Sequence, residues 1–169
     1  MSTSDNGTTW SPVFGVPADA QGSGVDHFIP GLAVDRSTAG SAAHLAVTFY
    51  YYPVPNCTTS SCELDVGYAT SPDGGATWTP NTRLAGPMSL TWLPNTSQGF
   101  MVGDYISTSF SGAPAYPAFA LANPPSGGLF DQATYTVRGG LSVTGANPAR
   151  DHTSAASSDA LTSGAVTAQ

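Results

Sequence analysis

The stretch SPDGGATW, at residues 71–78, decides the fold of this chain because a second stretch near the start has the same design. Residues 3–10 read TSDNGTTW, and both stretches fit the pattern S/T-x-D-x-G-x-T-W. Four residue types recur at identical spacing, so chance is a poor explanation. A motif that repeats along a chain indicates a repeat architecture, in which each copy marks one structural unit.

Each residue type in this motif, called the box from here on, suits a tight turn between two strands. Aspartate accepts hydrogen bonds from nearby backbone N–H groups, glycine adopts the positive φ that such turns often need, and tryptophan supplies an apolar anchor. The residues concerned are Asp5, Gly7 and Trp10 in the first box and Asp73, Gly75 and Trp78 in the second. The alternative is that the aspartates are catalytic or bind calcium, but the boxes lack the further acidic positions of a calcium loop. We interpret both boxes as structural and predict neither a metal nor a cofactor.

The composition limits the classes of partner. The 169 residues carry a formal net charge of -7, and all four basic residues other than histidine are arginines. This balance argues against nucleic acid and against an anionic membrane surface as partners. No apolar stretch approaches the length of a membrane span, so we also expect no membrane insertion. The length suits one domain with an ordinary core.

The two cysteines, Cys57 and Cys62, enclose four polar residues. This is not the CxxC spacing of a redox pair, and no histidine lies close in sequence to complete a zinc site. We predict a small structural disulfide, with a redox pair as the alternative. Structural disulfides are typical of oxidising compartments, so we expect an extracellular or secreted protein, although no signal peptide precedes the first box.

Short runs rich in β-branched and aromatic residues, separated by Gly- and Pro-rich turns, predict an all-β chain. The predicted strands cover residues 27–34, 43–52, 63–70, 79–85, 101–110, 116–122 and 132–137. The second box falls between the third and fourth of these, so the first four strands form one antiparallel unit and the last three begin another. Residues 139–169, rich in Gly, Ala, Ser and Thr, are predicted to be a disordered tail. Within it, only Leu141 and Val143 suit packing on a neighbouring unit.

The boxes resemble the Asp-box, or BNR repeat, of the sialidase superfamily, especially of exo-α-sialidase-like proteins. The segment Gly103-Asp104-Tyr105 is similar to a G-D-Y segment that is frequent in those sequences. The resemblance implies a partial β-propeller of four-stranded antiparallel blades. Residues 1–138 would hold the end of one blade, one full blade and most of another. Six blades are found in the family, so we expect either further blades in a longer protein or self-association.

The resemblance also directs attention to the ends of the innermost strands, which line the central channel of a propeller. Asp26, Asp104 and Tyr105 lie where two such strands are predicted to start, and they are our predicted catalytic residues because carboxylates and tyrosine can do acid–base work. His27 and Arg138 are the predicted substrate-binding residues. The alternative is that both aspartates cap the strands through bonds to backbone N–H groups.

One part of the family pattern is missing. Sialidases bind the substrate carboxylate with three arginines, the first of which lies in an aromatic-R-I-P sequence. Here Phe28 occupies the arginine position of the matching stretch HFIP, residues 27–30. Only four arginines exist in the whole chain, so we expect an incomplete catalytic set.

Two function classes follow from these observations. The first is a sialidase-like propeller fragment of glycoside hydrolase type, directed at a glycan and inactive as this chain alone. The second is a non-catalytic propeller segment that serves as a structural, protein-binding or lectin-like module. The aromatic run at residues 49–52 could stack on a sugar, but the blades of a propeller are covered on both faces, which favours a place in the core.

Overall fold

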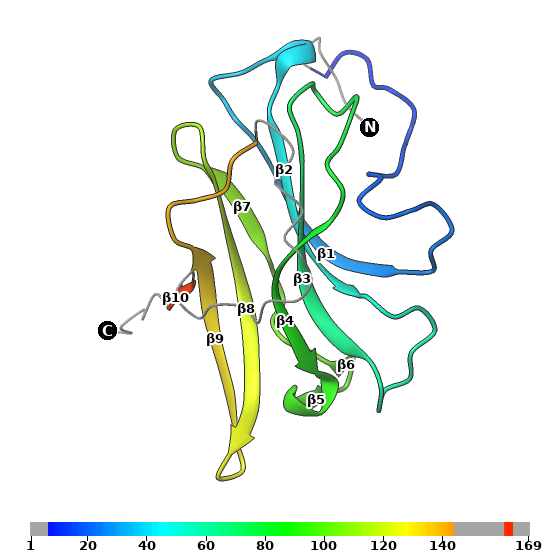
Figure 1. Ribbon diagram of the computed structural model, residues 1–169, viewed down its shortest axis with the longest axis vertical. Coiled ribbons are helices and arrows are strands. Elements are labelled where there is room, and N and C mark those ends of the chain that lie inside the picture. The colour runs from blue at the N-terminus through cyan, green and yellow to red at the C-terminus, as the bar shows by residue number, and fades with distance from the viewer. Residues whose placement is uncertain (1–6, 144–160, 164–169) are drawn as a thin grey trace.

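The computed structural model describes residues 7–143 and 161–163, which form two four-stranded antiparallel sheets (Figure 1). The first sheet contains, in spatial order, β1 (Asp26–Val34), β2 (Leu45–Tyr52), β3 (Glu63–Ser71) and β4 (Thr82–Ser89). The second runs from β10 (Leu161–Ser163) through β9 (Leu129–Val137) and β8 (Ala115–Ser126) to β7 (Ser107–Phe110). A small hairpin of β5 (Asn95–Thr96) and β6 (Gly99–Phe100) connects them, and 3-10 turns occupy Gly40–Ala42 and Leu90–Trp92.

The predicted all-β class and the antiparallel order of the first four strands are confirmed. The strand predicted at residues 101–110 is shorter than expected, because β7 begins at Ser107 and the preceding residues form a loop. Within the described part of the chain, the sheets do not close into a barrel or a propeller ring.

The structure also differs from the predicted tail. Leu141 exchanges backbone hydrogen bonds with Ala115, and Val143 is buried. Leu161–Ser163 forms β10, which pairs with β9 and gives the second sheet its fourth strand. Backbone pairing needs no large apolar side chain, so the composition of this segment did not reveal the strand. Residues 144–160 and 164–169 of the predicted tail lie outside the described residues.

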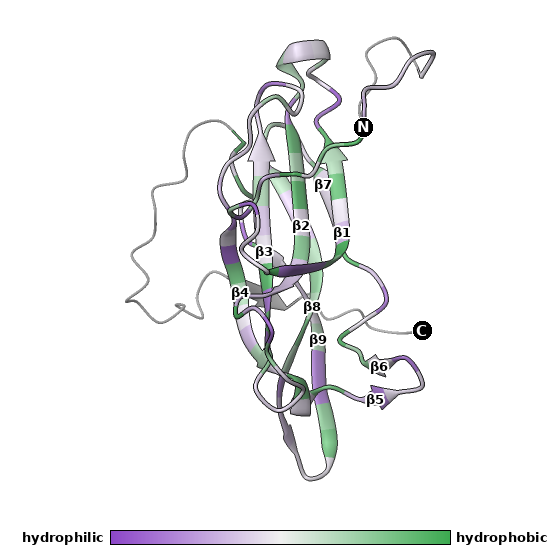
Figure 2. Ribbon diagram, turned by 90° about the vertical axis from the view of Figure 1, so that its right-hand side faces the viewer, coloured by the Kyte–Doolittle hydropathy of each residue, from purple (hydrophilic) through white to green (hydrophobic). Residues whose placement is uncertain are grey.

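The sheets pack face to face on one large core. Tyr50, Val66 and Met88 of the first sheet share this core with Phe119 and Leu121 of the second. Figure 2 shows further hydrophobic residues along the upper part of β2, where Ala46, Val47 and Phe49 are buried in two smaller cores. Residues 49–51 of the aromatic run are buried, which confirms their predicted place in the core.

Close approach of β1 and β7 fixes how the two sheets meet. A Cβ on Gly31 would lie 2.7 Å from the carbonyl oxygen of Ile106 and 2.8 Å from the Cα of Ser107, so only glycine fits there. Next to it, the Thr108 hydroxyl donates to the carbonyl oxygen of Gly31 at 2.7 Å. The buried hydroxyls of Thr48 and Thr108 lie 2.9 Å apart, so β2 joins the same polar contact.

The second box forms a hydrogen-bonded turn between β3 and β4, as predicted. Asp73 accepts bonds from both the backbone N–H and the hydroxyl of Thr77, at 2.8 and 2.6 Å. Both bonds lower the pKa of Asp73, and the bond from the Thr77 hydroxyl has the larger effect. Gly75 has a φ of 94°, and the indole N–H of Trp78 donates to its carbonyl oxygen at 3.1 Å. The carboxylate of Asp73 therefore forms hydrogen bonds that close the turn.

The first box can be compared only in part, because Asp5 lies outside the described residues. Gly7 has a φ of 84°, which matches the positive φ of its counterpart in the second box. Trp10 is 60% exposed, whereas Trp78 is partly buried.

The predicted disulfide between Cys57 and Cys62 is present, with the two Cα atoms 5.0 Å apart. It closes the loop that connects β2 to β3, and Cys62 is buried as part of the main core.

Candidate functional site

Asp26 and His27 begin β1 and point to opposite faces of the first sheet, since successive residues of a strand alternate. Asp26 pairs with Tyr52 across the ladder. Burial raises the pKa of the Tyr52 hydroxyl, and the nearby charge of Asp26 raises it further. His27 pairs with Tyr51 and lies on the other face. The structure therefore separates two predicted site residues that are neighbours in sequence.

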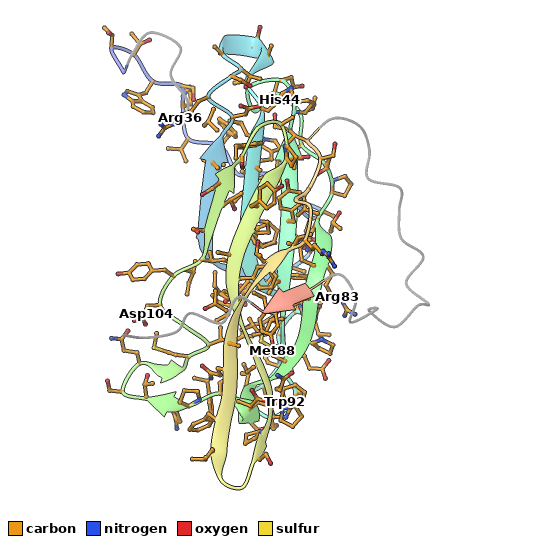
Figure 3. All side chains as sticks on the ribbon, turned by 90° about the vertical axis from the view of Figure 1, so that its left-hand side faces the viewer. Arg36, His44, Arg83, Met88, Trp92 and Asp104 are labelled. Carbon is orange, nitrogen blue, oxygen red and sulfur yellow. A yellow bond between two sulfur atoms is a disulfide. The ribbon has the colours of Figure 1, made fainter. Side chains whose placement is uncertain are left out.

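Asp104 and Tyr105 lie in the loop before β7, where both are exposed. Tyr105 is 87% exposed. Figure 3 shows Asp104 at one side of the molecule and Arg83 at the other. No hydrogen bond or ion pair within residues 7–143 joins either loop residue to Asp26, so their joint catalytic role stays a prediction.

Within residues 7–143, the arginines are distributed rather than gathered into a clamp. Arg138 is exposed just after β9, and β9 is separated from β7 by β8. Arg83 donates to Asp65 at 3.4 Å. Asp65 is buried, which raises the pKa of its carboxyl group, while Arg83 acts in the opposite direction. Arg83 thus compensates a buried carboxyl group on the sheet.

A polar pair that sequence analysis missed lies at His27. Its Nε2 atom is 2.7 Å from the Oδ2 atom of Asp19. The two side chains are 36% and 27% exposed, so solvent reaches both. Asp19 comes from residues 16–21, an irregular segment that crosses the outer face of the first sheet and is called the strap below. The strap has no periodic pattern, and nothing in the sequence connects it to a residue eight positions later.

Backbone and apolar contacts hold the strap in place. The backbone N–H of Asn81 donates to the carbonyl oxygen of Ala18 at 2.7 Å. Ala18 is buried in a small second core with Val47, Phe49 and Ala69. The strap is therefore packed onto the sheet, and Asp19 is carried to His27 on a fixed backbone.

Aromatic side chains fix the orientation of the imidazole ring. The ring of His27 stacks with that of Tyr51 at 6.2 Å between centroids and meets the edge of Phe49 at 5.0 Å. Burial, followed by the nearby charge of Asp65, raises the pKa of Tyr51 to about 12. The Tyr51 hydroxyl therefore stays protonated and neutral at physiological pH.

Two hollows flank Ala18. The first, of about 480 Å³, lies along the strap and is lined by Asp19, Gln21, Trp78 and Asn81, among others. The second, of about 260 Å³, is more apolar and is lined by Val16, Ala18, His27, Pro30, Val47 and Phe49. Asp19 lines the first hollow and His27 the second, so their hydrogen bond joins the two.

This arrangement can accept and donate hydrogen bonds beside an apolar surface. Asp19 holds one nitrogen of the imidazole, which leaves the other nitrogen for a ligand. No group of three or more metal-ligating side chains occurs in the described part of the chain. No helix among these residues is long and apolar enough to cross a membrane.

Comparisons of this chain with protein-family models, with curated proteins and with solved structures found no match.

Proposed function

We propose that the chain is a carbohydrate-directed, sialidase-like segment of a β-propeller, in which the two sheets are consecutive blades. The chain supplies a binding scaffold and lacks a complete catalytic centre of its own. The observation that carries this proposal is the turn formed by the second box.

The hydrogen bonds of Asp73 and Trp78 are those that the box needs as a structural turn, and they lie between the third and fourth strands of a four-stranded sheet. The packing of β1 against β7 through Gly31 supports the same proposal. Both strands begin their sheets in sequence, and in a propeller such strands lie nearest the central axis.

Closing a ring requires more than two sheets, so partner blades come from another part of a longer protein or from further copies of the chain. Exposed apolar side chains support such partners. Leu32 and Val34 are exposed on β1. Leu129, at the tip of the β8–β9 hairpin, is 75% exposed, and this hairpin is at the bottom of the view in Figure 2.

The incomplete catalytic set is supported by the positions of the charged residues. Phe28 packs against Tyr52 instead of presenting a guanidinium, and Arg83 is paired with Asp65. A bidentate clamp on a carboxylate needs several arginines that converge. The non-catalytic alternative, a lectin-like module, is favoured by this same observation.

Turnover and binding separate these outcomes. The chain is incubated with a fluorogenic sialoside, and its binding to sialylated and neutral glycosides is measured in parallel. We expect glycoside binding without turnover. Turnover that is abolished by Asp104→Asn and by Tyr105→Phe would instead establish a complete catalytic centre. The absence of any glycoside binding would refute the carbohydrate-directed function.

A further inference from the structure

We propose that the apolar hollow beside His27 is a subsite for a neutral sugar ring, and that Asp19 positions the histidine to accept a hydrogen bond from a sugar hydroxyl. This inference rests on the proposed carbohydrate-directed function and names a particular place and ligand charge for it.

The hydrogen bond to Asp19 determines what His27 offers. An ionised carboxylate only accepts, so the Nε2 atom of His27 carries the proton and donates at 2.7 Å. In the neutral imidazole, Nδ1 is then an acceptor with a free lone pair. No hydrogen bond to this nitrogen is formed within residues 7–143. The ring is 36% exposed, so a ligand can reach it.

The remaining walls of the hollow suit the apolar face of a pyranose. Val16 and Pro30 supply most of the apolar surface next to the imidazole, because both are exposed, and the nearly buried Val47 and Phe49 form the floor beneath them. A pyranose ring presents C–H groups on one face and hydroxyls around its edge, so it meets an apolar wall and a hydrogen-bond acceptor together. The hollow measures about 260 Å³ and is open to solvent, so one sugar ring can lie against its walls.

Charge selects against an acidic sugar at this position. The Asp19 carboxylate lies 2.7 Å from the His27 ring and borders the subsite, whereas Asp26 points to the opposite face of the sheet. The cation nearest in the sheet, Arg83, is already paired with the buried Asp65. A sialic acid carboxylate would therefore meet negative charge without a free guanidinium to bind it. The expected ligand is a neutral hexose, such as the sugar next to an acidic one in a branched glycan.

The test uses imidazole NMR signals of the whole chain, titrated with methyl β-galactoside, methyl β-glucoside and methyl α-sialoside. We expect a neutral glycoside to shift the His27 signals in a saturable way, with at least tenfold weaker binding for the sialoside. His27→Phe, which keeps an aromatic ring but removes the acceptor, should weaken binding at least tenfold, and Asp19→Ala should do the same. His44→Gln is the matched control, because His44 lies 4.0 Å from Asp35 at the other end of β2 and should leave binding unchanged.

The outcomes separate the subsite from the broader function. Binding of a glycoside that shifts other signals and leaves those of His27 unmoved would overturn the subsite while the carbohydrate-directed function stands. Equal affinity for the sialoside and the neutral glycosides, with His27 shifts in both, would overturn the charge selectivity. If none of the three glycosides shifts any signal, both the subsite and the function fail.

Discussion

Replacing Tyr50 with phenylalanine tests how the two sheets are joined. The Tyr50 hydroxyl donates to the carbonyl oxygen of Ala120 and accepts from its backbone N–H, both at 2.9 Å. Ladder pairing between β7 and β8 ends where Ser107 meets Ala118, so β8 has no β7 partner at Ala120. The Tyr50 hydroxyl therefore pairs the backbone N–H and C=O groups of Ala120 that a neighbouring strand would otherwise bond.

The substitution keeps the apolar ring and removes only these two bonds. Each lost bond contributes about 1–1.5 kcal/mol, because a backbone group of Ala120 is left without a partner, so the free energy of unfolding should fall by about 2–3 kcal/mol. With an m-value of about 1.5 kcal/mol/M, the urea midpoint should fall by about 1.3–2 M. Tyr50 has its pKa raised to about 12 by burial, so the loss should be the same from pH 6 to pH 8.

Urea unfolding followed by tryptophan fluorescence measures this change, and Tyr105→Phe serves as the control. Tyr105 is 87% exposed, so its hydroxyl should contribute less than about 0.5 kcal/mol. A loss of less than about 0.5 kcal/mol in Tyr50→Phe, with an unchanged m-value, would refute the argument that this hydroxyl completes the edge of β8.

Two further predictions address the junction and the box. Gly31→Ala should lower the free energy of unfolding, measured by urea titration, by about 1–3 kcal/mol, because the added methyl group overlaps the backbone of the second sheet. Gly15→Ala is the control and should change this free energy little, because a Cβ at Gly15 meets nothing within 4 Å. Asp73→Asn should lower the urea midpoint at pH 7. The ionised Asp73 has a lowered pKa in the folded chain, so its contribution is present above its ordinary pKa of 3.8 and is lost as the pH falls through the lower folded value. The decline of stability in acid should therefore be shallower in Asp73→Asn than in the parent chain, and parallel declines would contradict the assignment.

The strands that could be predicted from sequence are those with dense β-branched and aromatic residues. β2 and β3 are buried on both faces, and their apolar runs mark them clearly. The box at Asp73 was also predictable, because its residue types are dictated by the turn. β10 was not, since Leu161–Ser163 is held by backbone pairing with β9 rather than by an apolar run.

The candidate site was less accessible to sequence analysis for a related reason. His27 was identified, but its partner Asp19 lies on the strap, whose path is set by packing of Ala18 and by one backbone bond to Asn81. These are tertiary contacts without a local pattern. The site predicted at Asp26, Asp104 and Tyr105 rests on family resemblance, and its test remains the turnover assay.

The most direct test of the central claim is the binding of the chain to an array of neutral and sialylated glycans. The carbohydrate-directed function predicts saturable binding to a defined subset of glycans, which free glycoside of the same type competes away. Signals no higher than those of unglycosylated control spots, measured with chain shown to be folded by circular dichroism, would contradict it.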